Sequence, residues 1–239
     1  MLFSRWRRKG LWECVAHAVS EETQIKYVLL DSTIVQANRR CCINRARGRN
    51  GIDGHNCRRY ERIADERGLQ SVLFPSSRSI DATTPSAPGF GRRSKNGLQA
   101  LGHARSKLTI KLHLTVDEAG LPLQIIATEG QVPDIFCAHE LGKHLRTSAV
   151  IKEKSYDSGC LREHTMRTAR VRVVIQPRSN RKTTRHYSHK LYQTRHIVER
   201  FFNRIKHFLR ISTHYDKLTD KYLAFAVLCV CAFGSFLRM

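Results

Sequence analysis

The sequence predicts a mixed α/β sheet flanked by helices, and three stretches of the chain lead to this prediction. An apolar run at 26–33 indicates a buried strand, and alternating apolar residues over 106–130 indicate a β-hairpin. The segment 192–206 has the apolar periodicity of an amphipathic helix. With 239 residues, the chain is long enough for one sizeable core or for a domain that carries an insertion.

The amino-terminal part predicts a helix and then a strand. Apolar residues recur at helical spacing within 1–25, and the strand at 26–33 runs into Asp31, where it is expected to end. Catalytic groups often follow the carboxyl ends of strands in α/β sheets, whereas an Asp in such a place can also cap the next turn. Both interpretations of Asp31 are open at this point.

Residues 38–97 predict a basic insertion of low order. This stretch is rich in Arg, Gly, Ser and Pro, and it lacks the periodicity of a helix or a strand. We therefore interpret it as a flexible, positively charged insertion.

A regular pattern of strands and helices begins at residue 106. Residues 106–116 predict a half-buried strand with one polar face toward solvent, and 120–130 predict its antiparallel partner across a turn at Glu118–Gly120. The polar face consists of Thr109, Lys111, His113 and Thr115. The next elements are a helix at 134–147, a strand at 148–156, a helix at 158–170 and a strand at 171–177.

The helix predicted at 192–206 presents a group of polar side chains on one face. At roughly 100° per residue, four of them fall within about 60° of one another: Tyr192, Arg195, Glu199 and Lys206. A carboxylate among basic residues favours a metal ligand beside a phosphate-binding surface. The alternative is an ordinary amphipathic helix in which Glu199 pairs with Arg195 or Asn203.

The uncharged segment 222–237 predicts a buried carboxyl-terminal helix. It is shorter than the roughly 20 apolar residues that a membrane span needs, and a tail anchor is the alternative.

The formal net charge of the whole chain is +22, with a pI of about 10.3. A charge of this size favours a polyanionic partner, although it also occurs in basic proteins of other kinds.

Three acidic residues are candidates for a metal site: Asp31 and Glu153 on predicted strands, and Glu199 on the predicted helix. Carboxylate oxygens are hard ligands that suit Mg²⁺. Two such ions, about 3.5–4 Å apart, can activate a nucleophile and stabilise the leaving oxygen in phosphodiester chemistry.

At these residues the sequence resembles the DDE-class transposases of bacterial insertion sequences, in particular the insertion sequence five branch with its Tyr-Arg-Glu-Lys signature. The resemblance covers 22–36 and nearly all of 97–237. The segments that carry it include EKSYD, IQPRSNRK and LYQTRHIVERFFNRIK. Several ordered motifs in one chain make the resemblance specific.

The resemblance implies an RNase H-like fold for 26–37 and 98–239, preceded by a remnant of an amino-terminal helical region at 1–25. It also implies that Asp31, Glu153 and Glu199 bind Mg²⁺, or Mn²⁺ in its place. The resemblance further implies that Tyr192, Arg195 and Lys206 contact DNA phosphates. It implies further contacts with the DNA backbone at Lys107, Arg178, Arg181 and Lys182.

The activity implied is cleavage and strand transfer at the ends of an insertion sequence. The implied partner is double-stranded DNA, both the terminal inverted repeats and the target, bound by a homodimer at the cytoplasmic nucleoid and with no membrane partner.

One departure from the family's usual sequence supports an alternative function. Residues 153–157 are Glu-Lys-Ser-Tyr-Asp, where the family usually has Asp-Lys-Gly-Tyr-Asp. The longer Glu153 side chain could misplace a metal ion, which would leave an inactive DNA-binding remnant.

Overall fold

The computed structural model describes residues 9, 25–38, 70–73, 100–104, 107–138, 140–142, 147–169, 171–179, 185–216 and 219–236. Most of the predicted amino-terminal helix and most of the basic insertion lie outside these residues, as do Arg181 and Lys182.

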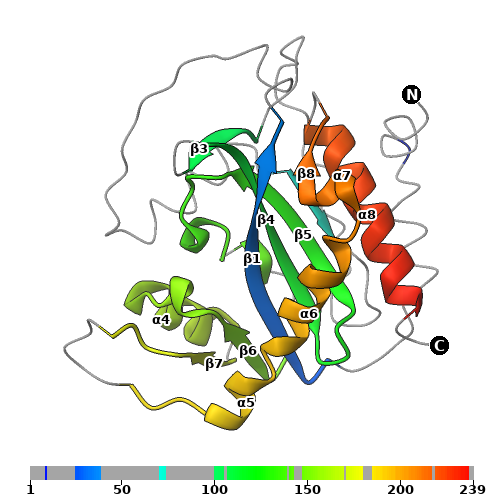
Figure 1. The fold of residues 1–239 in the computed structure, drawn as a ribbon. Helices are drawn as coiled ribbons and strands as arrows, with labels where there is room; N and C mark the ends of the chain where they lie inside the picture. The colour runs from blue at the N-terminus through cyan, green and yellow to red at the C-terminus, as the bar shows by residue number, and fades with distance from the viewer. Residues whose placement is uncertain are drawn as a thin grey trace.

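One mixed sheet of eight strands forms the centre of the described structure (Figure 1). The main order is β2-β5-β4-β1-β6-β7, while β3 pairs with β4 and β8 pairs with β1. The strands are β1 (Tyr27–Ala37), β2 (Gln70–Leu73), β3 (Gly102–Ala104), β4 (Lys107–Asp117), β5 (Pro122–Glu129), β6 (Ala149–Lys152), β7 (Arg172–Ile175) and β8 (Thr213–His214). The expected fold class, an RNase H-like mixed α/β sheet, is confirmed.

The central strand β1 joins two halves of different pairing. It is antiparallel to β4 on one side and parallel to β6 on the other. The expectation that this strand ends at Asp31 is wrong, because β4 pairs with β1 as far as Gln36. The pairing with β6, in contrast, stops at Leu30 and Lys152. Asp31 therefore lies in mid-strand, one residue beyond the last pair of the parallel half.

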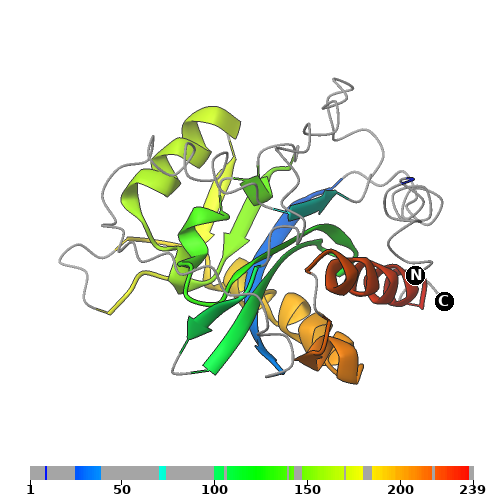
Figure 2. The ribbon, with the colours of Figure 1, turned by 90° about the horizontal axis from the view of Figure 1, so that it is seen from above.

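Helices cover both faces of the sheet (Figure 2). On one face lie α6 (His196–Ile205), α7 (Leu209–Ser212) and α8 (Thr219–Phe236), and on the other lies α4 (Gly159–Ala169). The remaining helical segments are α5 (His189–Gln193) and the 3₁₀ turns η2 (Asp134–Phe136), η3 (Glu140–Gly142) and η4 (Lys154–Tyr156). The helix predicted at 158–170 and the strand predicted at 171–177 are confirmed as α4 and β7, with small changes at their ends.

The helix predicted at 134–147 is wrong, because the described part of this stretch forms only η2 and η3. Burial gives the physical reason. Phe136, Cys137 and Ala138 are all buried, and three consecutive residues cannot share the single apolar stripe of an amphipathic helix. The chain instead winds in short turns across the sheet.

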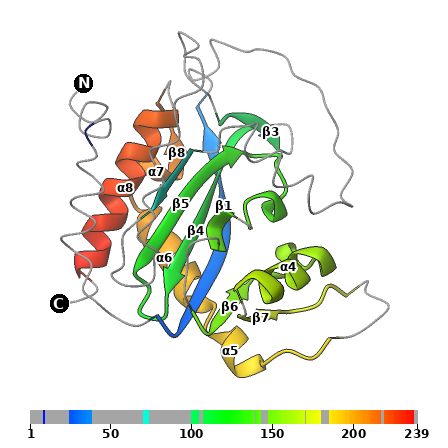
Figure 3. The same ribbon diagram turned by 180° about the vertical axis from the view of Figure 1, so that it is seen from behind.

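The larger core lies between the sheet and α6 and α8. Leu29, Leu112 and Val227 are among its fully buried members, and Figure 3 shows α8 running along the strands from the other side. The prediction of a buried carboxyl-terminal helix is confirmed, since Tyr222, Leu223 and five further apolar side chains of α8 are at most 3% exposed. Within the described residues, no helix is long and apolar enough to span a membrane.

The opposite face of β4 departs from expectation. Thr109, Lys111, His113 and Thr115 are buried, so the prediction of a solvent-facing polar side is wrong. The segment with η2 and η3 covers this side: Lys111 Nζ donates to Val132 O, and Thr115 Oγ1 donates to Leu141 O. The polar alternation therefore marks a buried polar layer.

The strand β2 lies inside the stretch for which the sequence predicts low order. It pairs antiparallel with β5, in the register Gln70 to Ala127. This pairing covers the outer edge of β5, which would otherwise present unpaired backbone groups.

The turn predicted at Glu118–Gly120 is confirmed, and its glycine allows a prediction. Gly120 has φ 84°, a left-handed conformation that costs a residue with a Cβ atom about 1–2 kcal/mol. Gly120→Ala is expected to lower the free energy of unfolding by about that amount in urea denaturation. Gly159→Ala is the matched control, since its Cβ would meet nothing closer than 3.5 Å and it lies in α4. Equal losses in both variants would contradict this account.

Candidate active site

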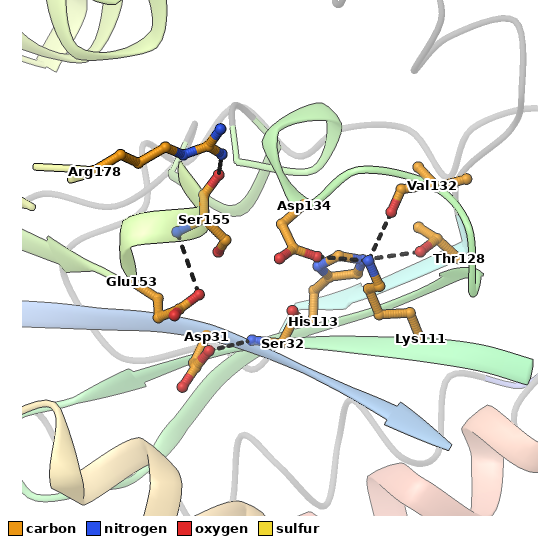
Figure 4. Close-up of polar contacts among 10 residues, drawn as sticks. All are labelled: Asp31, Ser32, Lys111, His113, Thr128, Val132, Asp134, Glu153, Ser155 and Arg178. Carbon is orange, nitrogen blue, oxygen red and sulfur yellow. Dashed lines mark hydrogen bonds and ion pairs between the residues drawn. The ribbon is translucent and has the colours of Figure 1, made fainter. Parts of the chain in front are cut away.

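The register of the parallel strands brings the first two acidic residues together. Leu30 of β1 is level with Lys152 of β6, so the next residues, Asp31 and Glu153, lie at the same level of the sheet. Figure 4 shows their side chains close to each other at this edge of β6. The carboxyl end of the parallel half is thus the place where two carboxylates meet.

Asp31 is almost fully buried, with 7% of its surface exposed. Its Oδ1 accepts a hydrogen bond of 2.8 Å from the Ser32 N–H, and its Oδ2 accepts one of 3.0 Å from Arg195 Nη1. The pKa of Asp31 is raised to about 6, mainly by burial and to a smaller extent by the charges of Glu153 and Glu199, while the Ser32 N–H and the charge of Arg195 oppose this rise. The carboxylates of Glu153 and Glu199 therefore both act electrostatically on Asp31.

Glu153 caps the short turn that follows β6. Its carboxylate accepts a 3.3 Å hydrogen bond from the Ser155 N–H, at the start of η4. Because η4 is a right-handed 3₁₀ turn, Ser155 adopts a backbone conformation that is open to any L residue, and this position does not require glycine.

Arg178 fastens this turn from the segment after β7. Its Nη2 donates to Ser155 O at 2.7 Å, and its Nε donates to Lys154 O at 3.2 Å. Its backbone N–H donates to Asp157 Oδ2 at 3.1 Å. Arg178, which the sequence predicts as a DNA contact, thus holds the turn that follows Glu153 in this structure (Figure 4).

Glu199 lies on α6, which faces β1 across the larger core. The single helix predicted over 192–206 is divided into α5 and α6 by a turn at Thr194 and Arg195. Thr194 Oγ1 donates to Leu191 O at 2.7 Å, and the backbone there forms short-range bonds, such as Arg195 N to Tyr192 O at 3.1 Å. The hydroxyl of Thr194 thus occupies a carbonyl that the helix would otherwise use, which tightens the turn.

Arg195 joins the first and third acidic residues. Its Nη1 lies 3.0 Å from Asp31 Oδ2, and its Nη2 lies 2.5 Å from Glu199 Oε1. Its guanidinium carbon also lies 5.7 Å from the centroid of the Tyr192 ring. The ion pair between Glu199 and Arg195 that the helical spacing allows is present, and the same Arg links Glu199 to the buried Asp31.

The remaining predicted DNA contacts lie at different distances from this centre. Tyr192 is half-buried, and its ring meets the ring of Tyr187 at 79° with 5.5 Å between centroids. Lys206 is half-buried at the end of α6. Lys107 begins β4 seven residues before Leu114, the partner of Asp31, which places it roughly 24 Å away along the strand. The structure therefore groups Tyr192 and Arg195 with the acids and leaves Lys107 apart.

Sequence reasoning missed a buried polar cluster on the face of the sheet opposite to Asp31 (Figure 4). Lys111 Nζ lies 2.9 Å from Asp134 Oδ1, and His113 Nε2 lies 2.9 Å from Thr128 Oγ1. Burial lowers the pKa of His113 to about 3, so this imidazole is neutral at pH 7. Burial opposes the charge of Asp134, but the hydrogen bond and charge of Lys111 lower its pKa overall. The signal in the sequence is the alternation of polar residues along β4, which by itself predicts a solvent face.

The three acids have the chemistry of a magnesium site, although they are not yet gathered around one point. Each offers hard oxygen donors, and their mutual repulsion at Asp31 would be relieved by a divalent cation. Among the described residues, no three His, Cys, Asp or Glu side chains stand close enough to hold one ion together. Arg195 bridges two of the carboxylates, so gathering them requires this guanidinium to release at least one.

Comparisons with known proteins identify a family for the chain. The family model described as the transposase DDE domain matches residues 73–233, a stretch that includes Glu153 and Glu199 and begins after β1. A putative transposase for insertion sequence element IS6501 from Brucella ovis is 32% identical over 126 residues, which cover 52% of this chain and 96% of that protein. No solved structure matches the chain.

Proposed function

The chain belongs to the family of transposases with a DDE domain, and from this premise we propose that it cleaves DNA at the ends of an insertion sequence and transfers the strands to a target. The observation that carries the proposal is the register of β1 and β6. It sets Asp31 beside Glu153, while Arg195 ties Glu199 to Asp31. One carboxylate from β1, one from the end of β6 and one from α6 thus lie in the same region although they are far apart in the sequence.

Asp31, Glu153 and Glu199 would hold Mg²⁺, with Mn²⁺ as a substitute. When bound, the ions would supply Lewis-acid activation of the attacking oxygen and charge neutralisation at the leaving oxygen. The chain itself supplies position: η4 and Arg178 orient Glu153, and burial keeps water from much of Asp31. Arg195, once released from a carboxylate, would be free to pair with a DNA phosphate beside Tyr192 and Lys206.

The partner under this proposal is double-stranded DNA, bound by a homodimer at the nucleoid, and the chain falls in the insertion sequence five branch. Lys107, Arg178, Arg181 and Lys182 would contact the DNA backbone. Residues 1–25 would belong to an amino-terminal helical region, and 38–97 would form a basic insertion in the catalytic domain.

One observation favours a second candidate, a DNA-binding protein without catalysis. Glu153 is one methylene longer than the usual Asp, and its carboxylate is already engaged by the N–H of Ser155. A ligand held in this way is less able to reach a metal ion in the tight octahedral geometry of Mg²⁺.

A nicking and strand-transfer assay on a supercoiled plasmid with the element ends decides between the candidates. We expect cutting with Mg²⁺ or Mn²⁺, none with EDTA, and none by Glu199→Ala in any metal. Glu153→Asp is the informative variant. If only this variant cuts, the native Glu153 is the lesion and the second candidate holds for the native chain. If no version cuts, transposition by this chain is ruled out.

A further inference from the structure

The outer face of α6 carries cations that the signature residues do not include. Residues 189–206 contain five Lys or Arg and one Glu. Arg195 is offset by two carboxylates, and Lys206 is half-buried. The exposed members of α6 include Arg200 and Arg204, and neither forms an ion pair with another described residue. Their charge is therefore available to a partner.

Helical geometry places these two arginines together. They are four residues apart, so they lie on one side of α6 about 6 Å apart along its axis. Val198, Phe201 and Ile205 occupy the buried side of the same helix, which fixes its rotation and turns the arginines to solvent. Arg200 follows Glu199 with a rotation of roughly 100° around the helix, so the pair lies on the solvent side of α6 next to the side that carries Glu199.

From this placement we infer that Arg200 and Arg204 bind successive phosphates of the DNA backbone and hold the duplex against the solvent side of α6, next to the side that carries Glu199. The inference rests on the proposed function for the identity of the polyanion and adds the surface that holds it. Charge complementarity commits the surface to DNA: the chain carries a net charge of +22, and two guanidinium groups that pair with no carboxylate among the described residues suit, at this spacing, neighbouring phosphates on a strand. Such contacts position the duplex and carry no sequence information.

The salt dependence of binding tests this assignment separately from catalysis. Affinity for a labelled duplex is measured by fluorescence anisotropy in EDTA, over a series of salt concentrations. The slope of log affinity against log salt is expected to fall in magnitude by about 0.9 for Arg200→Gln or Arg204→Gln and by about 1.8 for the double variant. Gln has a helix propensity close to that of Arg, so α6 should remain folded, and circular dichroism checks this.

Arg172→Gln is the matched control, because Arg172 is exposed at the first residue of β7, the end of that strand away from the acids. Its slope should equal that of the native chain. An unchanged slope in the double variant would show that the arginines are only a solvated helix face and would overturn the inference. An equal fall in the control would overturn it too, because the effect would then be general charge. Binding is measured in EDTA, where no cutting occurs, so the two tests are independent. A chain that fails the nicking assay can still show the expected change in slope, and a chain that cuts DNA can still fail to show it.

Discussion

Asp31→Asn is expected to abolish metal-dependent cleavage and to stabilise the metal-free protein above pH 6. The asparagine keeps the shape of the side chain but removes the negative charge that a divalent cation needs. We expect the cleavage rate to fall at least about a thousandfold, which corresponds to about 4 kcal/mol in the barrier. The measurement is plasmid nicking under saturating Mg²⁺.

The gain in stability follows from the sign of the pKa shift. The carboxyl of Asp31 has a pKa of about 6 when folded and 3.8 as the ordinary value, so the folded state binds the proton more tightly. Stability contributed by this group therefore declines as the pH rises from about 4 to about 6. The amide of the Asp31→Asn variant does not titrate, and the variant should exceed the native chain by on the order of 1–3 kcal/mol above pH 6.

Thermal unfolding in EDTA between pH 5 and pH 8 measures this gain. Glu163→Gln, at an exposed position of α4, is the control for removal of one negative charge and should change neither activity nor stability appreciably. A loss of stability in Asp31→Asn at pH 8 would show that the ion pair with Arg195 outweighs the burial of the charge. Retained cutting would remove Asp31 from the catalytic set.

Asp134→Asn is expected to destabilise the protein by about 3–5 kcal/mol, because it leaves the ammonium of Lys111 buried without its counter-charge. The side chains of Lys111 and Asp134 are only 11% and 13% exposed, and their charged atoms lie 2.9 Å apart. Urea denaturation at pH 7 measures the loss. Since the pKa of Asp134 is lowered on folding, this stabilisation is present above the ordinary value of 3.8 and disappears as the pH falls through the folded value.

A double-mutant cycle separates the ion pair from simple packing. Lys111→Met alone should also be costly, since it leaves the carboxylate of Asp134 buried and unpaired, whereas Lys111→Met with Asp134→Leu should recover most of the loss. If Asp134→Asn costs less than about 1 kcal/mol, the pair behaves as a solvent-screened surface bridge instead.

The local sequence pattern is sufficient to predict the helices and strands that bury one face against the core. The β-hairpin, α4, β7 and α8 follow from periodicity within their own residues. The extent of β1 is not accessible in this way, because residues after Asp31 are held by pairing with β4, which lies more than 70 residues later in the chain. Tertiary pairing sets that boundary.

The candidate site shows the same division. The presence of Glu199 and its pairing with Arg195 follow from their four-residue spacing on a helix. The contact of Arg195 with Asp31 does not, since it depends on how α6 packs across the sheet. Similarly, Lys111 and His113 alternate as surface residues would, and only the covering turn with Asp134 shows that they form a buried layer.

The register of β1 and β6, which sets Asp31 beside Glu153, also determines which genetic changes the site can tolerate. Successive side chains of a strand point to opposite faces, so the gain or loss of one codon between Tyr27 and Asp31 would turn the carboxylate away from α6 and toward the layer of Lys111 and Asp134. An in-frame insertion of three nucleotides in this short window would thus be as damaging to the element's mobility as loss of the acid itself. Copies of the element that still move should keep the length of this window even where its apolar residues exchange with one another.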